Sequence, residues 1–236
     1  MPQYLIPPEN IRNGEFLAGE EESNHIARAA RARVGDEIEI FDGLGNRYRA
    51  EVKTIGPGMV SGSVKEKLPS PVYKTKLTLC FGVPARQALE SALECCTAAG
   101  VEVFQPVTSS RVQFDLFSGW DRKLPRLVQL AAAACKQCGR GRLPEIRKPE
   151  KFDDLLLAGG AAVIASADGV SADEAARCLA ATTGLKLFVG PEGGFTKGEL
   201  EFARSKGAVF MNLGLHTLRA EEACFAASCA LLTRLG

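Results

Sequence analysis

Two glycine-bearing turns near the C-terminus are the clearest candidates for a ligand site in this sequence. GPEGG (residues 190–194) follows the apolar run 185–189, and Gly214 follows the apolar run 209–213. Glycine lets the backbone approach a ligand closely and adopt dihedral angles closed to other residues, which suits a flat adenosine held by main-chain groups. Neither turn matches the glycine patterns that bind dinucleotides or nucleoside triphosphates. Judged by spacing alone, GPEGG could equally be a simple tight turn.

The segments around these turns alternate between strands and helices. Predominantly apolar runs predict strands at 77–81, 101–107, 161–166, 185–189 and 209–213. Helical periodicity predicts helices at 85–99, 121–138, 151–158 and 220–234. Two further helices open on the capping-box pairs Ser171 with Glu174 and Thr196 with Glu199. This alternation predicts a mostly parallel sheet covered on both faces, with ligands beyond the carboxyl ends of its strands, where both turns would lie. The inward stripe of the 121–138 helix would comprise Leu124, Leu127, Val128, Ala131 and Cys135.

The first 70 or so residues follow a different pattern of polar and apolar side chains. Residues 37–41 and 47–52 each alternate polar and apolar side chains, and turn residues lie between them. Period-two alternation predicts a half-buried antiparallel hairpin, and residues 60–64 predict a further strand. Pro69-Ser70-Pro71 marks a linker. The N-terminal part is therefore predicted to be a small β-barrel.

Composition and charge narrow the class of protein. Apolar residues make up 46% of the 236-residue chain and the net charge is +1, as in a soluble globular protein. The sequence shows neither an apolar run long enough to span a membrane nor a secretory signal, which leaves the cytosol as the expected location. Residues 106–151 carry ten Lys and Arg against four Asp and Glu, a local balance of +6. Such a segment suits localised phosphate contact, although a solvated charged loop has the same composition.

The eight cysteines do not follow a metal or disulfide pattern. Cys135 and Cys138 form a CxxC, but no second pair completes four ligands. The other six lie in apolar or helical stretches, where a free cysteine acts as a small buried hydrophobe. We therefore expect core cysteines and no metal.

At the glycine turns the sequence resembles a known family. LFVGPEGGFTKGELEFA and MNLGLHTLRAEEACFAA resemble the SPOUT superfamily, specifically its RsmE-type 16S ribosomal RNA uridine-N3 methyltransferases. Weaker similarities are His25 with GDEIEIFDGLGNRYRAEV, Thr97–Val101 followed by Pro106 and Ser110-Arg111, and Gln137–Arg140 with Pro144. Two departures stand out. The family's TELG glutamate is Ala98, and the two threonines of its LRTETA are Ala220 and Glu222.

The resemblance implies an α/β protein with a PUA-like β-barrel for RNA binding at residues 1–70 and a SPOUT trefoil-knot methyltransferase domain at 73–236. It implies S-adenosylmethionine as cofactor, ribosomal RNA or the small ribosomal subunit as substrate, and a homodimer. The cofactor-binding residues would be Ala165, Gly190, Pro191, Glu192, Gly193, Gly194, Leu213, Gly214 and Leu218.

Catalysis in such a protein needs the uridine N3 to lose its proton. We hypothesise that Glu192 or Glu221 acts as general base and that Arg219 stabilises charge developing on O2 or O4. The carboxylate of Glu192 could instead interact favourably with the positive end of the following helix's dipole. Arg219 could form a structural ion pair with Glu221 or Glu222. The arginines predicted to contact RNA are Arg28, Arg31, Arg33, Arg47 and Arg49 on the barrel and Arg111, Arg140 and Arg142 on the C-terminal domain.

Two rival functions remain compatible with the sequence. The chain could be a non-catalytic RNA-binding module in which the glycine turns only shape loops, or an α/β enzyme with another adenine-containing cofactor. His25 and His216 are the only histidines. His216 lies in the expected cofactor loop, but a lone histidine is more often packed or solvated than catalytic.

Overall fold

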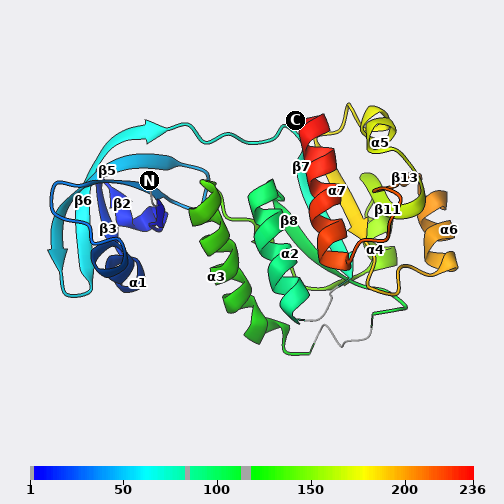
Figure 1. The fold of residues 1–236 in the computed structure, drawn as a ribbon, viewed down its shortest axis with the longest axis horizontal. Coiled ribbons are helices and arrows are strands. Elements are labelled where there is room, and N and C mark those ends of the chain that lie inside the picture. Colours follow the sequence, from blue (N-terminus) through cyan, green and yellow to red (C-terminus); the bar gives the residue numbers. More distant parts are fainter. Residues whose placement is uncertain (1–2, 83–85, 113–117) are drawn as a thin grey trace. The chain divides into compact units, whose positions relative to one another are not determined.

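The computed structural model describes residues 3–82, 86–112 and 118–236. These residues form two compact units, one of 1–71 with 132–143 and the other of 72–131 with 144–236 (Figure 1). The expected start of a helix at residue 85 lies outside the described residues.

The N-terminal unit is built on a six-stranded curled sheet in the order β1-β4-β5-β6-β3-β2. The predicted hairpin is confirmed, because β4 and β5 pair antiparallel with Ile38 opposite Ala50. Apolar residues of the alternating pattern, such as Ile40 and Val52, are fully buried in its core. The strands are β1 (Gln3–Leu5), β2 (Ile11–Arg12), β3 (Glu15–Ala18), β4 (Glu37–Phe41), β5 (Arg47–Gly56) and β6 (Met59–Leu68), and the helical turns are η1 (Pro8–Asn10), α1 (Glu20–Asn24) and η2 (His25–Ala29).

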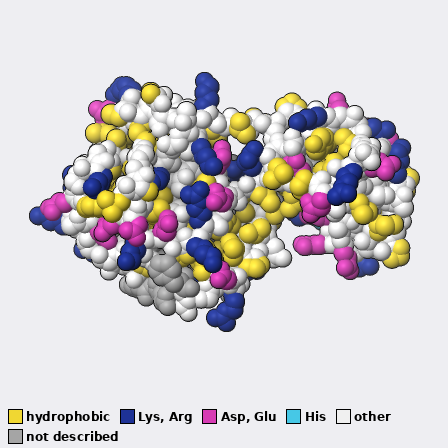
Figure 2. Space-filling view, turned by 180° about the vertical axis from the view of Figure 1, so that it is seen from behind, with side chains coloured by type: hydrophobic (Ala, Val, Ile, Leu, Met, Phe, Trp, Pro, Cys, Tyr) yellow, Lys and Arg dark blue, Asp and Glu magenta, His cyan; other side chains and the backbone are white. Residues whose placement is uncertain are grey.

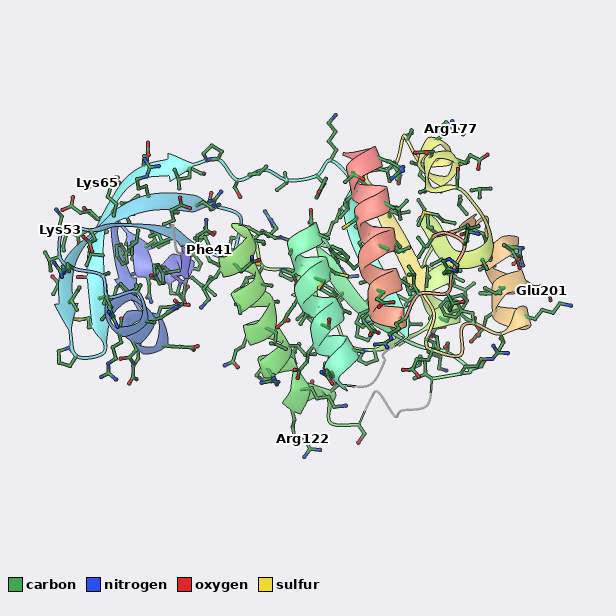
Figure 3. The ribbon with its side chains drawn as sticks, in the orientation of Figure 1. Phe41, Lys53, Lys65, Arg122, Arg177 and Glu201 are labelled. Atoms are coloured by element: carbon green, nitrogen blue, oxygen red, sulfur yellow. The ribbon has the colours of Figure 1, made fainter. Side chains whose placement is uncertain are left out.

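Paired charges occupy the polar positions of this sheet. Lys53 on β5 and Lys65 on β6 both form ion pairs with Glu51 (Figure 3). Hydrogen bonds from these two lysines lower the pKa of Glu51 to about 2. The alternation therefore separates a buried apolar face from an ion-paired polar one.

The segment Ala132–Leu143 groups with the N-terminal unit, although it lies within the range 73–236 expected for the C-terminal domain. Lys136 forms an ion pair with Glu22 of α1 at 2.6 Å. Arg142 makes β-bridges with Gly43 and Leu44, and Leu143 donates its backbone N–H to the Gly43 carbonyl. These contacts hold the segment against α1 and against the loop after β4.

The C-terminal unit contains a seven-stranded sheet whose main path is β10-β8-β7-β12-β11-β13, with β9 beside β8. Every pairing in it is parallel, which confirms the predicted parallel sheet. The central register sets Leu187 of β12 between Leu79 of β7 and Val163 of β11. The strands are β7 (Lys76–Gly82), β8 (Val103–Thr108), β9 (Glu145–Ile146), β10 (Glu150–Lys151), β11 (Ala161–Val170), β12 (Gly184–Val189) and β13 (Val209–Met211).

Helices cover both faces of this sheet, as predicted. Alternate residues of β7 separate two cores, with Leu79 in the first and Cys80 in the second. The first core includes α2, α3, α5 and α7, and the second includes α4 and α6. Helices α2 and α7 run side by side (Figure 1). The helices are α2 (Arg86–Ala99), α3 (Trp120–Cys138), α4 (Phe152–Leu157), α5 (Ala172–Cys178), α6 (Lys197–Ser205) and α7 (Ala220–Leu235).

Two details of the predicted packing are wrong. Val128 on α3 is 41% exposed although it was expected on the inward stripe, because Leu127 and Ala131 occupy the face that packs on the core. Cys95 and Cys178 are exposed rather than buried, since they lie on the outer faces of α2 and α5. An apolar residue in a helix is buried only when the helix turns it inward.

Both predicted capping boxes are confirmed. At α5, Ser171 and Glu174 exchange hydrogen bonds between side chain and backbone. At α6, Thr196 and Glu199 make the same reciprocal pair. The second box fixes the chain just after GPEGG and so shapes that turn.

Candidate active site

A cavity of about 830 Å³ lies at the carboxyl ends of three neighbouring strands of the parallel sheet, β11, β12 and β13. This is the size of a small-molecule site, at the edge where parallel sheets bind ligands. Most of its wall comes from three segments, namely residues 165–167 of β11, residues 189–195 at the end of β12 and after it, and residues 212–221 from the end of β13 to the start of α7. Ala88 of α2, Leu200 of α6 and Ala223 of α7 complete it.

Two glycines in these segments adopt backbone conformations that other residues rarely reach. Gly194 has φ +66° and Gly214 has φ +132°. A Cβ on Gly82, at the end of β7, would lie 2.6 Å from the backbone nitrogen of Pro191. The GPEGG turn therefore packs directly against the neighbouring strand, as close backbone approach requires.

Eight of the nine expected cofactor residues line the cavity. They are Ala165, Gly190, Pro191, Glu192, Gly194, Leu213, Gly214 and Leu218. Gly193 does not line it, and its carbonyl oxygen instead accepts a hydrogen bond from Nη1 of Arg111 at 2.7 Å.

The three expected catalytic residues also line the cavity. Arg219 is the N-cap of α7, and its backbone N–H donates to Oε2 of Glu222 at 2.9 Å. The carboxylate of Glu222 thus caps the N-terminus of α7 by accepting a backbone N–H. The half-buried Glu221 and the exposed Glu192 line the cavity. Within the described residues, no ion pair joins the side chain of Arg219 to Glu221 or Glu222, and its bond to Glu222 is made by the backbone N–H. The catalytic role of Arg219 stays a prediction.

Glu199 joins the GPEGG turn to the loop after β8. Its Oε1 accepts the backbone N–H of Ser110 at 2.8 Å, and its Oε2 accepts that of Thr196 at 2.7 Å. Burial acts to raise the pKa of this carboxyl, but the hydrogen bonds from Ser110 and Thr196 outweigh it, so the pKa is lowered. Together with Arg111 and Gly193, this carboxylate fixes residues 110–111 beside the turn.

Several cavity residues were not anticipated from the sequence. Asn212 directly precedes the recognised LG, and Ser166 and Ala167 directly follow the recognised Ala165. In the sequence, these three residues could have been found from their place next to residues that the family resemblance already assigned to the cofactor. His216 also lines the cavity, as its place in the loop suggested.

The eight arginines expected to contact RNA differ in their surroundings. Arg28, Arg31 and Arg33 are exposed in one short stretch, whereas Arg47 pairs with Glu39 at 2.8 Å and Arg49 pairs with Glu66. Arg142 is exposed and Arg140 is half-buried, and both belong to the segment that groups with the N-terminal unit. Arg111 is exposed beside Gly193.

Neither the cysteines nor the helices reveal a further kind of site. Sγ of Cys135 lies 3.5 Å from the Arg142 carbonyl, and burial raises its pKa to about 12. Among residues 3–82, 86–112 and 118–236, no group of three or more His, Cys, Asp or Glu side chains could hold a metal ion. In the same part of the chain, no helix has the length and apolarity needed to cross a bilayer.

The fold and the cavity define a two-part protein in which a curled β unit accompanies a parallel α/β unit with a ligand cavity at its strand ends. Residues 71–232 match the model of the RNA methyltransferase domain, and residues 17–64 match that of the RNA methyltransferase PUA domain. The chain belongs to the RNA methyltransferase domain family.

Individual relatives agree with this membership. The Rickettsia conorii protein called ribosomal RNA small subunit methyltransferase E is 26% identical over 215 residues, spanning 89% of this chain and 86% of that protein. Its Aquifex aeolicus namesake is 28% identical over 223 residues, spanning 93% and 95%. Ribosomal RNA small subunit methyltransferase E from Neisseria gonorrhoeae, solved bound to S-adenosyl methionine, superposes with a TM-score of 0.88 at 23% identity, over 99% of this chain and 97% of that one.

These matches confirm the resemblance and the fold class drawn from the sequence. The C-terminal unit has the SPOUT α/β trefoil-knot fold and is preceded by a small PUA-like β unit. The domain limits 1–70 and 73–236 stay predictions.

Proposed function

We propose that this chain transfers a methyl group from S-adenosylmethionine to N3 of a uridine in the RNA of the small ribosomal subunit. The observation that carries the proposal is the cavity at the ends of β11, β12 and β13, which brings Arg219, Glu192 and Glu221 together with both glycine turns. Its support from relatives is that the Rickettsia and Aquifex proteins bear the name of a small-subunit RNA methyltransferase.

The cavity residues fit the cofactor in size and chemistry. The volume of about 830 Å³ suits a nucleoside with an amino-acid tail. Apolar side chains such as Leu213 and Leu218 would contact the adenine, backbone groups at Gly190 and Gly194 would hold its polar edges, and the carboxylates would favour a cation. S-adenosylmethionine, when bound, supplies an electrophilic methyl group on a sulfonium. The Neisseria protein was solved with this molecule bound.

The protein's own chemical contribution would be deprotonation and charge stabilisation at the base. Uridine N3 becomes a good nucleophile only as it loses its proton, so a carboxylate must accept that proton. Glu221 is the better placed candidate, because it is half-buried at the cavity wall while Glu192 is exposed. The guanidinium of Arg219 would stabilise the negative charge that spreads onto O2 or O4. Orientation of the base against the methyl donor would supply much of the rate.

RNA would be bound by the N-terminal unit and by Arg111, which lies beside the GPEGG turn. Arg28, Arg31 and Arg33 offer exposed guanidinium groups, which suit phosphate contact. Arg47 and Arg49 have carboxylate partners, so their charge is largely balanced. Figure 2 shows Lys and Arg next to Asp and Glu on the visible face of this unit rather than one uninterrupted basic surface. Binding would therefore depend on a local arginine cluster.

The proposal includes a homodimer acting in the cytoplasm, where ribosomal RNA is found. Leu215 beside the cavity is 99% exposed and Phe225 on α7 is 43% exposed. The homodimer itself is what the family resemblance implies, and these two exposed side chains are candidates for its interface. Light scattering coupled to gel filtration should give twice the chain mass, and a monomer at all concentrations would contradict the dimer.

The deciding experiment supplies labelled S-adenosylmethionine and small ribosomal subunits from cells lacking this activity. Labelled 3-methyluridine after nucleoside digestion is the expected product. A label on another nucleoside would redirect the specificity. No transfer, with RNA still bound, would favour the non-catalytic RNA-binding module.

A further inference from the structure

Asn212 directly follows β13, and its side-chain amide joins the cavity segment 165–167 of β11 to the loop that contains Asn212 itself. Its Nδ2 donates to the carbonyl oxygen of Ala167 at 2.6 Å. Its Oδ1 accepts the backbone N–H of Gly214 at 2.6 Å. Both partners line the same cavity as Asn212 itself.

The backbone around this amide leaves little freedom. The pairing of β11 with β13 shifts register between Ala165 and Val170, so residues 166–169 bulge out of the sheet. A Cβ on Gly169 would lie 2.5 Å from the backbone of Met211, and the backbone N–H of Asn212 donates to the Val170 carbonyl at 2.8 Å. The base of the bulge is thus held by close packing, and its cavity end is held by the Asn212 amide.

We propose that Asn212 is a positioning residue of the cofactor site, setting the spacing between residues 165–167 of β11 and the segment at 212–221. This inference rests on the proposed function. The Asn212 amide donates through Nδ2 and accepts through Oδ1 at once, whereas a carboxylate in its place could only accept. Its acceptor also holds Gly214 at φ +132°, a conformation that the loop would otherwise leave at little cost.

Two substitutions separate the two halves of the amide. Asn212→Asp keeps an acceptor for Gly214 but sets a carboxylate oxygen against the Ala167 carbonyl. Asn212→Ala removes both bonds. We expect each to weaken binding of S-adenosylmethionine and S-adenosylhomocysteine about tenfold, as the loss of one or two hydrogen bonds in a site would. The KM for the cofactor should rise in parallel while kcat changes less than about threefold.

Ser205→Ala is the matched control. Its hydroxyl also donates to a backbone carbonyl, that of Phe202 at 2.7 Å, but on α6 and outside the cavity wall. Calorimetric titration of the four proteins, with thermal unfolding measured on each, makes the test. Cofactor affinities in both Asn212 variants equal to those of wild type and Ser205→Ala would overturn the inference.

Two other outcomes are also decisive. If both variants unfold below the assay temperature, Asn212→Ser is titrated with the cofactor instead. Its hydroxyl can still accept the Gly214 N–H, and its side chain is smaller than that of Asn. Unfolding of all three would overturn the positioning role in favour of a purely structural one. Failure of the wild-type protein to bind either molecule would instead refute the proposed function, which keeps the two failures distinct.

Discussion

The guanidinium of Arg111 donates a hydrogen bond from Nη1 to the carbonyl oxygen of Gly193, at 2.7 Å. Arg111 belongs to the basic stretch that the sequence assigns to RNA, and Gly193 to the turn that it assigns to the cofactor. The structure therefore joins two features that lie 82 positions apart along the chain. One arginine can influence both binding events.

Replacing this arginine should weaken cofactor binding without direct contact. Arg111→Ala frees the Gly193 carbonyl, and we expect about a three- to tenfold loss of affinity for S-adenosylmethionine, the range of one lost hydrogen bond. Calorimetry measures it. Arg177→Ala, on the outer surface of α5 (Figure 3), is the control. If Arg111→Ala lowers RNA affinity but leaves cofactor affinity intact, the bond to Gly193 has no role in the site.

The lowered pKa of Glu199 predicts a pH-dependent contribution to stability. A carboxyl whose folded-state pKa lies below its unfolded value stabilises the protein above the unfolded pKa, and this stability is lost as pH falls through the folded pKa. Wild type should therefore melt above Glu199→Gln at pH 7, and the gap should close as pH falls below about 4.

Thermal unfolding from pH 7 to 3 checks this expectation. Glu201→Gln on the same helix is the control, since Glu201 is exposed and its ion pair with Lys197 is long at 3.9 Å. A gap between wild type and Glu199→Gln that stays constant over the whole range would mean that the carboxylate charge is not what Ser110 and Thr196 require.

Arg219 should act on turnover rather than on cofactor affinity. We expect Arg219→Ala to lower kcat by about 100-fold, the usual effect of removing a group that stabilises developing charge, while cofactor affinity changes little. Single-turnover methyl transfer and calorimetry give the two quantities. Turnover near the wild-type value in a folded Arg219→Ala protein would exclude this residue from the mechanism.

The exposed arginines of the N-terminal unit should account for part of the salt dependence of RNA binding. Replacing Arg28, Arg31 and Arg33 together by Ala should reduce the slope of log affinity against log salt by up to about 2, at roughly 0.7 per phosphate contact. Arg49→Ala should leave the slope unchanged, because Arg49 pairs with Glu66. Equal slopes for wild type and the triple variant would move the RNA site elsewhere.

Local sequence patterns predicted the helices and strands well, because each pattern reflects which side chains of one segment are buried. The mostly apolar run 185–189 forms the central strand β12, and the pair Thr196 and Glu199 marks the start of α6. The site residues followed from glycine turns and a family resemblance. What local patterns could not indicate depends on distant partners: β11 continues past its expected end at residue 166 because a bulge lets Val170 pair with Met211.

The same limit explains the contacts that organise the site. In the sequence, Asn212 is a polar residue within the strand expected at 209–213, whereas β13 ends at Met211 and the role of Asn212 depends on Ala167, 45 positions earlier. Ser110 and Glu199 lie 89 positions apart. Neither pair has a spacing that a helix or hairpin would explain, so only the folded chain reveals them.

A crystal structure of this protein soaked with S-adenosylhomocysteine would test the central claim most directly, namely that the loops at 190–194 and 212–219 enclose a methyl-donor site. The account predicts ligand density within the cavity that Glu192, Gly214 and Arg219 line. Density for the ligand on another surface, or a cavity that stays empty at saturating concentration, would contradict it.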